Sequence, residues 1–261
     1  MQCQTCRYVF ADLNLSDDDF AALYNHHFFR EGEWVDYAAD QKFINKNFEL
    51  RLQVLRRFVR AERHRKLLEI GSAYGFFLDA ARNDFQLLQG IDLTEEGVRH
   101  TREQLHLEAV QADFLKHDFG GDKFDVVCLW DTIEHLRRPD LYLQKISDYT
   151  ESGALLTVTT GDIGSLNARA RGARWRMIHP PTHAHYFSSQ TLARLLDAHG
   201  FDVVYNRYCG FYRSVSNVAY NILVLRHNRR QLFERLHKSG VLDWGFYLNL
   251  YDILYVIARK R

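Results

Sequence analysis

A segment with two glycines, residues 67–82, constrains the fold of this chain more than any other feature. It consists of an apolar run that contains Glu69, then glycines at positions 71 and 75, then a helical pattern up to Arg82. This order predicts a strand, a tight turn and a helix. Glycine in such a turn lets the backbone approach a ligand that a Cβ would push away. The segment therefore predicts a ligand-binding turn at the end of a buried strand.

The spacing of these glycines separates the turn from two common nucleotide-binding turns. The pattern is Glu-Ile-Gly-Ser-Ala-Tyr-Gly, whereas dinucleotide-binding turns have Gly-x-Gly-x-x-Gly. A phosphate-binding loop would continue with Gly-Lys-Ser or Gly-Lys-Thr, which does not follow here.

Apolar segments alternate regularly with helical patterns after residue 40. The expected strands are Lys66–Ile70, Leu87–Ile91, Glu108–Gln111, Phe124–Trp130, Ala154–Thr159, Phe201–Tyr208 and Asp252–Lys260. The expected helices are Ile44–Val59, Phe76–Asn83, Glu95–Leu105, Asp140–Tyr149 and Ser188–Gly200. Such alternation predicts an α/β fold with a mostly parallel, doubly wound sheet that binds its ligand at the carboxyl ends of the strands.

Three further regions interrupt this alternation. Residues 1–40 are expected to form an N-terminal appendage, and residues 41–261 the main domain. Within that domain, the irregular stretch 161–187 is long enough to predict a lid. Residues 212–250 form an expected insertion before the last strand, in which apolar residues at helical spacing over 214–237 indicate one helix. That helix is expected to cover the sheet or a dimer partner, with a membrane surface as the alternative.

Charge and cysteine content exclude several classes of protein. The net charge of +1 gives no electrostatic reason to expect a nucleic-acid partner. The four cysteines are too few and too scattered for a disulfide framework, and no apolar run reaches the roughly 18 residues of a membrane span. Cys3 and Cys6 supply half of a zinc site, which His26 and His27 could complete, but one such pair is a weak signal. We therefore expect a cytoplasmic protein without a transmembrane segment and without bound metal.

Acidic residues follow two successive expected strands. Asp92 ends the second strand of the alternation, about 20 residues after Gly71, where dinucleotide folds place the acid that binds a ribose. Asp113 follows the third strand, and Phe114 comes next. Because the carboxyl ends of parallel strands share one edge of a sheet, these acids and the glycine turn are expected to surround one ligand.

The ordered set of glycine turn, Asp92 and Asp113 resembles class I S-adenosylmethionine-dependent methyltransferases. The resemblance implies a Rossmann-like sheet of seven strands, with an antiparallel last strand inserted beside its neighbour, and S-adenosyl-L-methionine as cofactor. It implies that the glycine turn contacts the methionine and ribose portions, Asp92 the ribose hydroxyls and Asp113 the adenine amine. The cofactor-binding residues expected on this basis are Glu69, Gly71, Ser72, Ala73, Gly75, Phe76, Asp92, Leu93, Asp113, Phe114, Trp130 and Asp131.

The segment Trp130-Asp-Thr-Ile-Glu-His135 follows the fourth expected strand. In the resembling family this position lies beside the methyl group and the acceptor. Trp130 could line the cofactor pocket near the sulfonium, and Asp131 could reach the methionine ammonium. His135 is the first candidate for a general base, because histidine changes charge near neutral pH. The alternative is that Glu134 and His135 only hold the turn.

A second part of the resemblance covers residues 155–201. Trp175, the run His-Pro-Pro-Thr-His-Ala-His-Tyr-Phe-Ser at 179–188 and Gly200-Phe201 are similar to a branch of bacterial methyltransferases of polysaccharide, lipid or secondary-metabolite pathways. His183 and His185 share one face of an extended chain and are alternative candidates for the base or an orienting group.

The expected function is methyl transfer to a small-molecule or carbohydrate acceptor, with a hydroxyl oxygen favoured over nitrogen or carbon. A homodimer is one expected assembly. Two alternatives stay open: a non-catalytic partner protein that keeps the cofactor pocket, and a nicotinamide oxidoreductase, which the glycine spacing disfavours.

Overall fold

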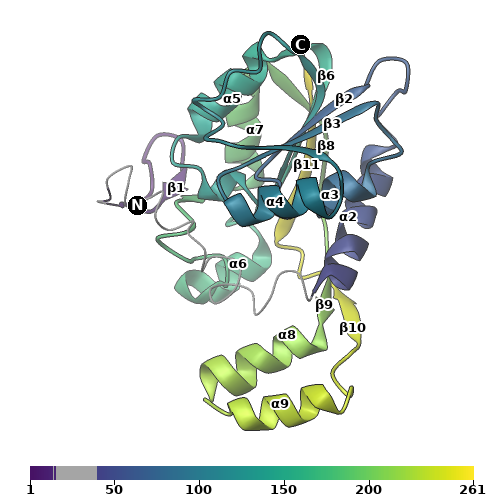
Figure 1. Cartoon of the computed structure of the whole chain (residues 1–261). Coiled ribbons are helices and arrows are strands. Elements are labelled where there is room, and N and C mark those ends of the chain that lie inside the picture. Colours follow the sequence, from purple (N-terminus) through teal and green to yellow (C-terminus); the bar gives the residue numbers. More distant parts are fainter. Residues whose placement is uncertain (14, 16–39) are drawn as a thin grey trace.

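The computed structural model describes residues 1–13, 15 and 40–261 and is built around a seven-stranded sheet (Figure 1). In spatial order the strands are β4 (Glu108–Gln111), β3 (Leu87–Asp92), β2 (Lys66–Ile70), β5 (Phe124–Trp130), β6 (Thr150–Gly161), β11 (Ile253–Lys260) and β8 (Phe201–Tyr208). The first five are parallel to one another, and β11 is antiparallel to both of its neighbours. The predicted Rossmann-like sheet with an inserted antiparallel last strand is confirmed.

The parallel register aligns the ends of the central strands. Glu69 of β2 lies opposite Gly90 of β3 and Cys128 of β5, and Trp130 at the end of β5 lies opposite Thr159 of β6. The turns after β2, β3 and β5 therefore leave the sheet at the same edge. This is the edge where ligands bind in open α/β sheets.

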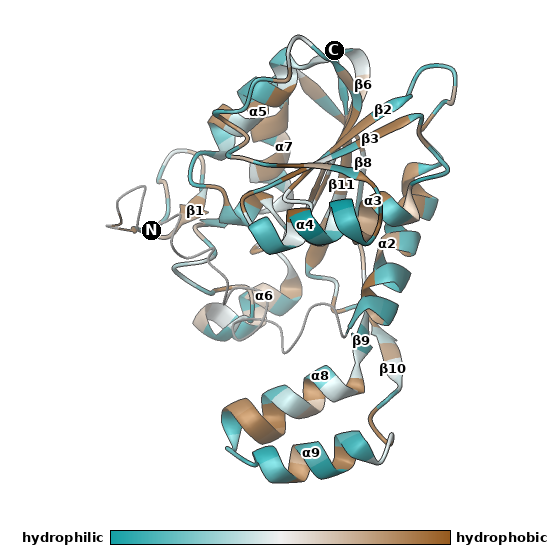
Figure 2. Cartoon of the chain, viewed as in Figure 1, coloured by the Kyte–Doolittle hydropathy of each residue, from teal (hydrophilic) through white to brown (hydrophobic). Residues whose placement is uncertain are grey.

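Helices cover both faces of the sheet and enclose two apolar cores. On one face, α2 (Gln41–Leu55) and α3 (Phe76–Ala80) bury Phe48, Leu52 and Phe77 against β2 and β5. On the other face, α5 (Pro139–Asp148) and α7 (Ser189–Ala198) bury Leu143 and Leu196. Helix α4 (Glu95–Glu103) packs beside β3 and β4. Apolar residues gather in the strands and on the helix faces that look toward them (Figure 2).

Local signals explain why the expected elements form with nearly the expected bounds. Helix α7 begins with a capping box, in which the Ser188 side chain accepts from the Thr191 backbone N–H and the Thr191 hydroxyl accepts from the Ser188 backbone N–H. These bonds satisfy backbone donors that a helix start leaves open. Helix α5 has Pro139 in its first turn, where a missing N–H costs nothing.

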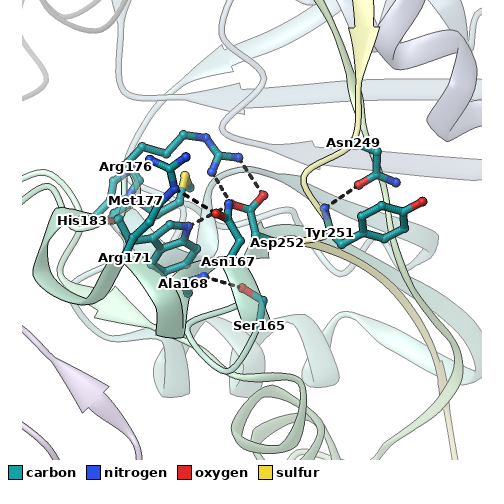
Figure 3. Close-up of polar contacts among 11 residues, drawn as sticks. Ser165, Asn167, Ala168, Arg171, Arg176, Met177, His183, Asn249, Tyr251 and Asp252 are labelled. Atoms are coloured by element: carbon teal, nitrogen blue, oxygen red, sulfur yellow. Dashed lines mark hydrogen bonds and ion pairs between the residues drawn. The ribbon is translucent and has the colours of Figure 1, made fainter.

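The predicted lid, residues 161–187, is more ordered than the sequence suggested. It contains α6 (Leu166–Arg171), a 3-10 turn (Gly172–Arg174) and β7 (His185–Tyr186), which pairs with β1 (Val9–Phe10) near the N-terminus. One buried carboxylate holds this stretch to the sheet (Figure 3). Asp252, just before β11, accepts hydrogen bonds from Asn167 Nδ2 at 2.6 Å, Trp175 Nε1 at 2.9 Å and both terminal nitrogens of Arg176.

The single helix expected over 214–237 is wrong, and the stretch does not cover the sheet; the cover of a dimer partner stays a prediction. A two-stranded ribbon, β9 (Phe211–Ser214) and β10 (Gly245–Leu248), carries a helical hairpin away from the sheet (Figure 1). The hairpin consists of α8 (Val215–Tyr220), a π-helical turn (Asn221–Arg226) and α9 (Arg230–Lys238). Asn228 adopts a φ of 52°, which reverses the chain between the helices. Val224, Phe233 and Leu242 form a small core within the hairpin, against which Val215 and Leu236 pack, whereas Ile222, Leu225 and Leu232 are exposed.

No described helix is long and apolar enough to cross a membrane. The histidines at 26 and 27, which could complete a metal site with Cys3 and Cys6, lie outside the described residues.

The position of Asp252 generates a prediction about stability. Asp252→Ala should lower the free energy of unfolding by about 3 kcal/mol at neutral pH, because it leaves the Arg176 charge and the Trp175 N–H without their acceptor. Urea denaturation followed by circular dichroism measures this change. Asp122→Ala is the control, because Asp122 forms only an exposed ion pair with Lys66 and should cost under about 1 kcal/mol. Equal losses in the two variants would contradict the anchoring role.

Candidate active site

The turn after β2 is packed so closely that a larger side chain at Gly71 or Gly75 would disrupt it. Gly71 and Gly75 have φ values of 75° and 74°, and Ala73 between them has 45°. A Cβ on Gly71 would lie 2.8 Å from Thr132 Oγ1, which belongs to the turn after β5. A Cβ on Gly75 would lie 2.5 Å from Thr101 Oγ1 of α4. The turn is thus held in a left-handed conformation that glycine tolerates, in direct contact with the segment after β5.

Asp92 fastens this turn to the end of β3. Its Oδ2 accepts from the Ala73 backbone N–H at 2.8 Å, and its Oδ1 accepts from the N–H and the hydroxyl of Thr94, at 2.8 and 2.6 Å. Burial raises the pKa of Asp92 above its ordinary value, and the bonds from Thr94 and Ala73 oppose this rise. A carboxylate has about four lone-pair sites. The arrangement therefore leaves capacity for a further hydrogen-bond donor.

Several buried polar atoms near this turn have no hydrogen-bond partner within the described part of the chain. They are Glu69 Oε2, Ser72 Oγ and Trp130 Nε1. Burial raises the pKa of Glu69 well above its ordinary value, and the charge of Asp92 adds to the effect. Buried polar groups in native proteins are nearly always satisfied, so orphaned atoms at a strand edge indicate a polar ligand.

Arg51 of α2 is a site residue that the sequence analysis missed. Its guanidinium is 6% exposed, pairs with Asp131 Oδ2 at 3.0 Å and lies 5.7 Å from the Trp130 ring centre. Arg51 falls on the apolar face of α2, together with Phe48 and Leu55. A charged residue at a core-facing position of a helix is a signal that could have found it, because arginine is almost never fully buried unless it is paired.

Asp131 itself is tightly constrained. It adopts a φ of 49°, and its Oδ1 accepts from the Thr159 hydroxyl at 2.9 Å. Its Oδ2 accepts from Arg51. The carboxylate therefore joins α2, β5 and β6 at the carboxyl edge of the sheet.

The remaining expected cofactor residues occupy different surroundings. Asp113 accepts from the Leu115 N–H at 2.9 Å and pairs with Lys116. Phe114 is buried in the core, where it stacks on Tyr142. Leu93 is exposed after β3, whereas Phe76 is buried at the first position of α3.

Two of the three expected catalytic histidines lie together. The rings of His135 and His183 are perpendicular, with centres 4.5 Å apart. His135 Nδ1 bonds the Thr182 carbonyl at 3.0 Å, and His183 Nδ1 bonds the Met177 carbonyl at 2.8 Å. Glu134, next to His135 in the short turn Ile133–His135, is buried beside them. Burial, together with the charge of His183, lowers the pKa of His135 to about 3.

His185 is engaged elsewhere. Its Nδ1 bonds the Tyr8 hydroxyl at 2.6 Å, and its Nε2 bonds the Arg137 carbonyl at 3.3 Å. Because a carbonyl only accepts, Nε2 carries the proton and Nδ1 accepts from Tyr8. His185 thereby links β7 to β1 instead of joining the pair of His135 and His183.

Comparison with known proteins decides the family. A profile of methyltransferase domains matches residues 41–206, which is more than half of the chain. The chain belongs to this family. It is an S-adenosylmethionine-dependent methyltransferase of class I, and S-adenosylmethionine is its cofactor. No curated protein matches the sequence significantly.

Solved methyltransferase structures share the fold. An S-adenosylmethionine-dependent methyltransferase of Archaeoglobus fulgidus is 19% identical, with a TM-score of 0.56 over 86% of this chain and 99% of that one. A Thermotoga maritima methyltransferase is 15% identical, with a TM-score of 0.57 over 90% and 99%. The N-methyltransferase NodS of Bradyrhizobium japonicum, in complex with S-adenosylhomocysteine, is 15% identical, with a TM-score of 0.52 over 81% and 86%. At these identities the likeness concerns the fold.

The contact between Gly71 and Thr132 can be tested by substitution. Gly71→Ala should lower the free energy of unfolding through two effects, the left-handed φ and the overlap of the new Cβ with Thr132. Gly120→Ala is a matched control, since Gly120 has a φ of 64° but a Cβ added there would meet no atom within 4 Å. Gly71→Ala should therefore cost about 1–3 kcal/mol more than Gly120→Ala. Equal costs in chemical denaturation would show that the turn has room to relax.

Proposed function

We propose that this methyltransferase methylates a hydroxyl oxygen of a small-molecule or glycan acceptor. The observation that carries the proposal is the group formed by Glu134, His135 and His183 at the active edge of the sheet. A hydroxyl must lose its proton on methylation, whereas a neutral amine attacks with a lone pair that is already available. Side chains that accept protons or bind oxygen, gathered next to the cofactor turn, therefore favour an oxygen acceptor.

The residues around the turn suit the cofactor chemically. When bound, S-adenosylmethionine supplies an electrophilic methyl group on a sulfonium. We assign the buried Arg51 guanidinium to the methionine carboxylate, and Glu69 and Asp131 to the methionine ammonium. Trp130 would face the sulfonium, since a ring attracts a cation. The narrow backbone turn at Gly71–Gly75, which a Cβ would fill, supports this assignment, as do the orphaned atoms of Glu69, Ser72 and Trp130.

The other end of the cofactor is assigned to the acids that follow β3 and β4. Asp92 would accept from a ribose hydroxyl with the lone pair that Ala73 and Thr94 leave over. Asp113 would accept a hydrogen bond from the adenine amine, and Phe114, which follows it, and Leu93, which follows Asp92, would lie near the adenine. Phe76 supports this end from the start of α3, where it packs against Tyr74.

Acceleration would come mostly from positioning. Aligned intramolecular reactions reach effective molarities of about 10⁵–10⁸ M, and a positioned proton acceptor adds about 10²–10⁴-fold. The fixed turns after β2 and β5 provide such alignment. We further assign residues 161–187, together with the β9–β10 ribbon and its helical hairpin, to the walls of the acceptor site. Residues 1–40 are assigned to an appendage on the domain of residues 41–261.

Assembly and location are part of the same proposal. Ile222, Leu225 and Leu232 are exposed on the hairpin, which supports a homodimer that covers them. The four free cysteines support a reducing compartment such as the cytoplasm.

The ribose assignment is tested with Asp92→Asn. The amide accepts hydrogen bonds less strongly than the carboxylate. S-adenosylhomocysteine should therefore bind at least about tenfold more weakly, which corresponds to the loss of one charge-assisted hydrogen bond. Isothermal titration calorimetry measures the affinity. Asp118→Asn is the control, because Asp118 also accepts from a backbone N–H but lies in an exposed turn. An unchanged affinity in Asp92→Asn would remove Asp92 from the cofactor site.

The role of His135 is tested with His135→Ala and a panel of hydroxylated acceptors. The variant should keep its affinity for S-adenosylhomocysteine and lose about 10²–10⁴-fold in kcat. Mass spectrometry and NMR of the product identify the methylated atom. Unchanged turnover would assign His135 to structure, and a product methylated on nitrogen would contradict the oxygen acceptor. Tight S-adenosylhomocysteine binding without turnover on any acceptor would instead favour the non-catalytic alternative.

A further inference from the structure

We propose that Glu134, His135 and His183 bind one divalent cation, and that its open position takes the acceptor oxygen. The second half of this statement rests on the proposed function. The sequence predicts no bound metal, because the pair of Cys3 and Cys6 is a weak signal for a metal site. The fold brings His183 to the adjacent residues Glu134 and His135, which lie far from it in sequence, and this juxtaposition carries the proposal.

The three side chains are close enough to share an ion. Each offers one ligand atom, and these atoms all lie within 4.8 Å of one another. Metal–ligand bonds of about 2.0–2.2 Å place neighbouring ligand atoms roughly 3–3.5 Å apart. Closing the group around an ion thus requires side-chain shifts of about 1 Å, which rotamer adjustments supply. Glu134 and His183 are buried, whereas His135 is half-buried, so an ion there would be shielded by the protein but reachable from the side of His135.

The hydrogen bonds of the histidines orient them for ligation. Both rings bond a backbone carbonyl through Nδ1, His135 to Thr182 and His183 to Met177. A carbonyl only accepts, so Nδ1 carries the proton and the lone pair of each ring is on Nε2. Metal-binding histidines almost always donate their second N–H to a carbonyl, carboxylate or water in this way.

The segment that carries His183 is fixed at several points. Figure 3 shows His183 beside Met177 and Arg176, and Arg176 is held by the buried Asp252. The Tyr186 hydroxyl donates to the His183 carbonyl at 2.9 Å. The Ala184 N–H donates to the Glu134 carbonyl at 2.9 Å, which ties the two halves of the site together. Ligands on such supported backbone lose little freedom when they bind an ion.

The ligand types select the class of metal. Two imidazoles and one carboxylate suit first-row transition cations such as Zn²⁺, Mn²⁺ or Fe²⁺, whereas Mg²⁺ prefers oxygen ligands. Three protein ligands leave at least one position open, as in catalytic sites. A bound cation lowers the pKa of a coordinated oxygen strongly, for water from 15.7 to about 7. An acceptor hydroxyl at the open position would be activated in the same way, with its proton passing to solvent.

The site follows, in the chain, a residue that contacts the cofactor turn. Thr132, two residues before Glu134, forms the contact with Gly71 in which a Cβ would overlap. An oxygen held by Glu134, His135 and His183 would therefore approach the edge of the sheet from the side of the β5 turn. This position suits an acceptor that meets the methyl donor.

The proposal is tested by binding Mn²⁺ to the full chain after treatment with a chelator. Electron paramagnetic resonance of free Mn²⁺ should show one bound ion per chain. Glu134→Gln and His183→Gln should each weaken binding by about 100-fold or more, beyond the 10–100-fold typical of residues outside the ligand set. His199→Gln is the matched control, because His199 Nδ1 also donates to a backbone carbonyl, that of Leu195, at 2.7 Å but lies at the end of α7. It should leave Mn²⁺ affinity unchanged.

The outcomes separate this proposal from the proposed function. Absence of stoichiometric Mn²⁺ binding, or an equal loss in all three variants, would overturn the cation site. If His183→Gln does not fold, Glu134→Gln gives the same decision, since it keeps the volume of the side chain. Calorimetry with S-adenosylhomocysteine on the same metal-free samples tests the cofactor site independently. Cofactor binding without Mn²⁺ binding would reject the cation alone.

Discussion

The parallel register of β2, β3 and β5 is the constraint on which the active edge depends. The hydrogen bonds that align Glu69 with Gly90 and with Cys128 also make the three following turns leave the sheet side by side. Asp92 then reaches back to Ala73, and Gly71 packs on Thr132. A shift of register in any of these strands would separate the cofactor turn from Asp92 and from the residues after β5. The chemistry of the site is thus a consequence of how the core strands pair.

A second constraint acts through Asp252. This carboxylate is buried at the start of β11, a strand paired with β6 and β8, and it binds three residues of the 161–187 stretch. Burial raises its pKa, but the hydrogen bonds and charge of Arg176 outweigh that effect, and the pKa is below its ordinary value. The last strand of the fold therefore positions the loop that delivers His183 to Glu134 and His135. Residues distant in sequence meet because one ionised side chain connects them.

The sequence predicted the sheet and most helices because each has a strong local signal. Apolar runs, the capping box at Ser188 and the glycines of the first turn all act over a few residues. It did not predict Arg51 in the site, because the importance of Arg51 depends on contacts with Asp131 and Trp130. It also misjudged the 214–237 stretch, where the chain reverses at Asn228 and where the β9–β10 ribbon depends on pairing between distant segments. His135 and His183 were each expected as catalytic candidates, but their juxtaposition with Glu134 was not, because it depends on contacts between distant segments.

The central claim is that methyl donor and acceptor oxygen meet at this edge, between the Gly71–Gly75 turn and Glu134. A crystal structure of the full chain with S-adenosylhomocysteine and Mn²⁺, with anomalous data collected for manganese, tests it most directly. We expect the adenosine next to Asp92, the sulfur facing the turn that contains Asp131, and an anomalous peak among Glu134, His135 and His183. S-adenosylhomocysteine bound away from the Gly71–Gly75 turn would contradict it.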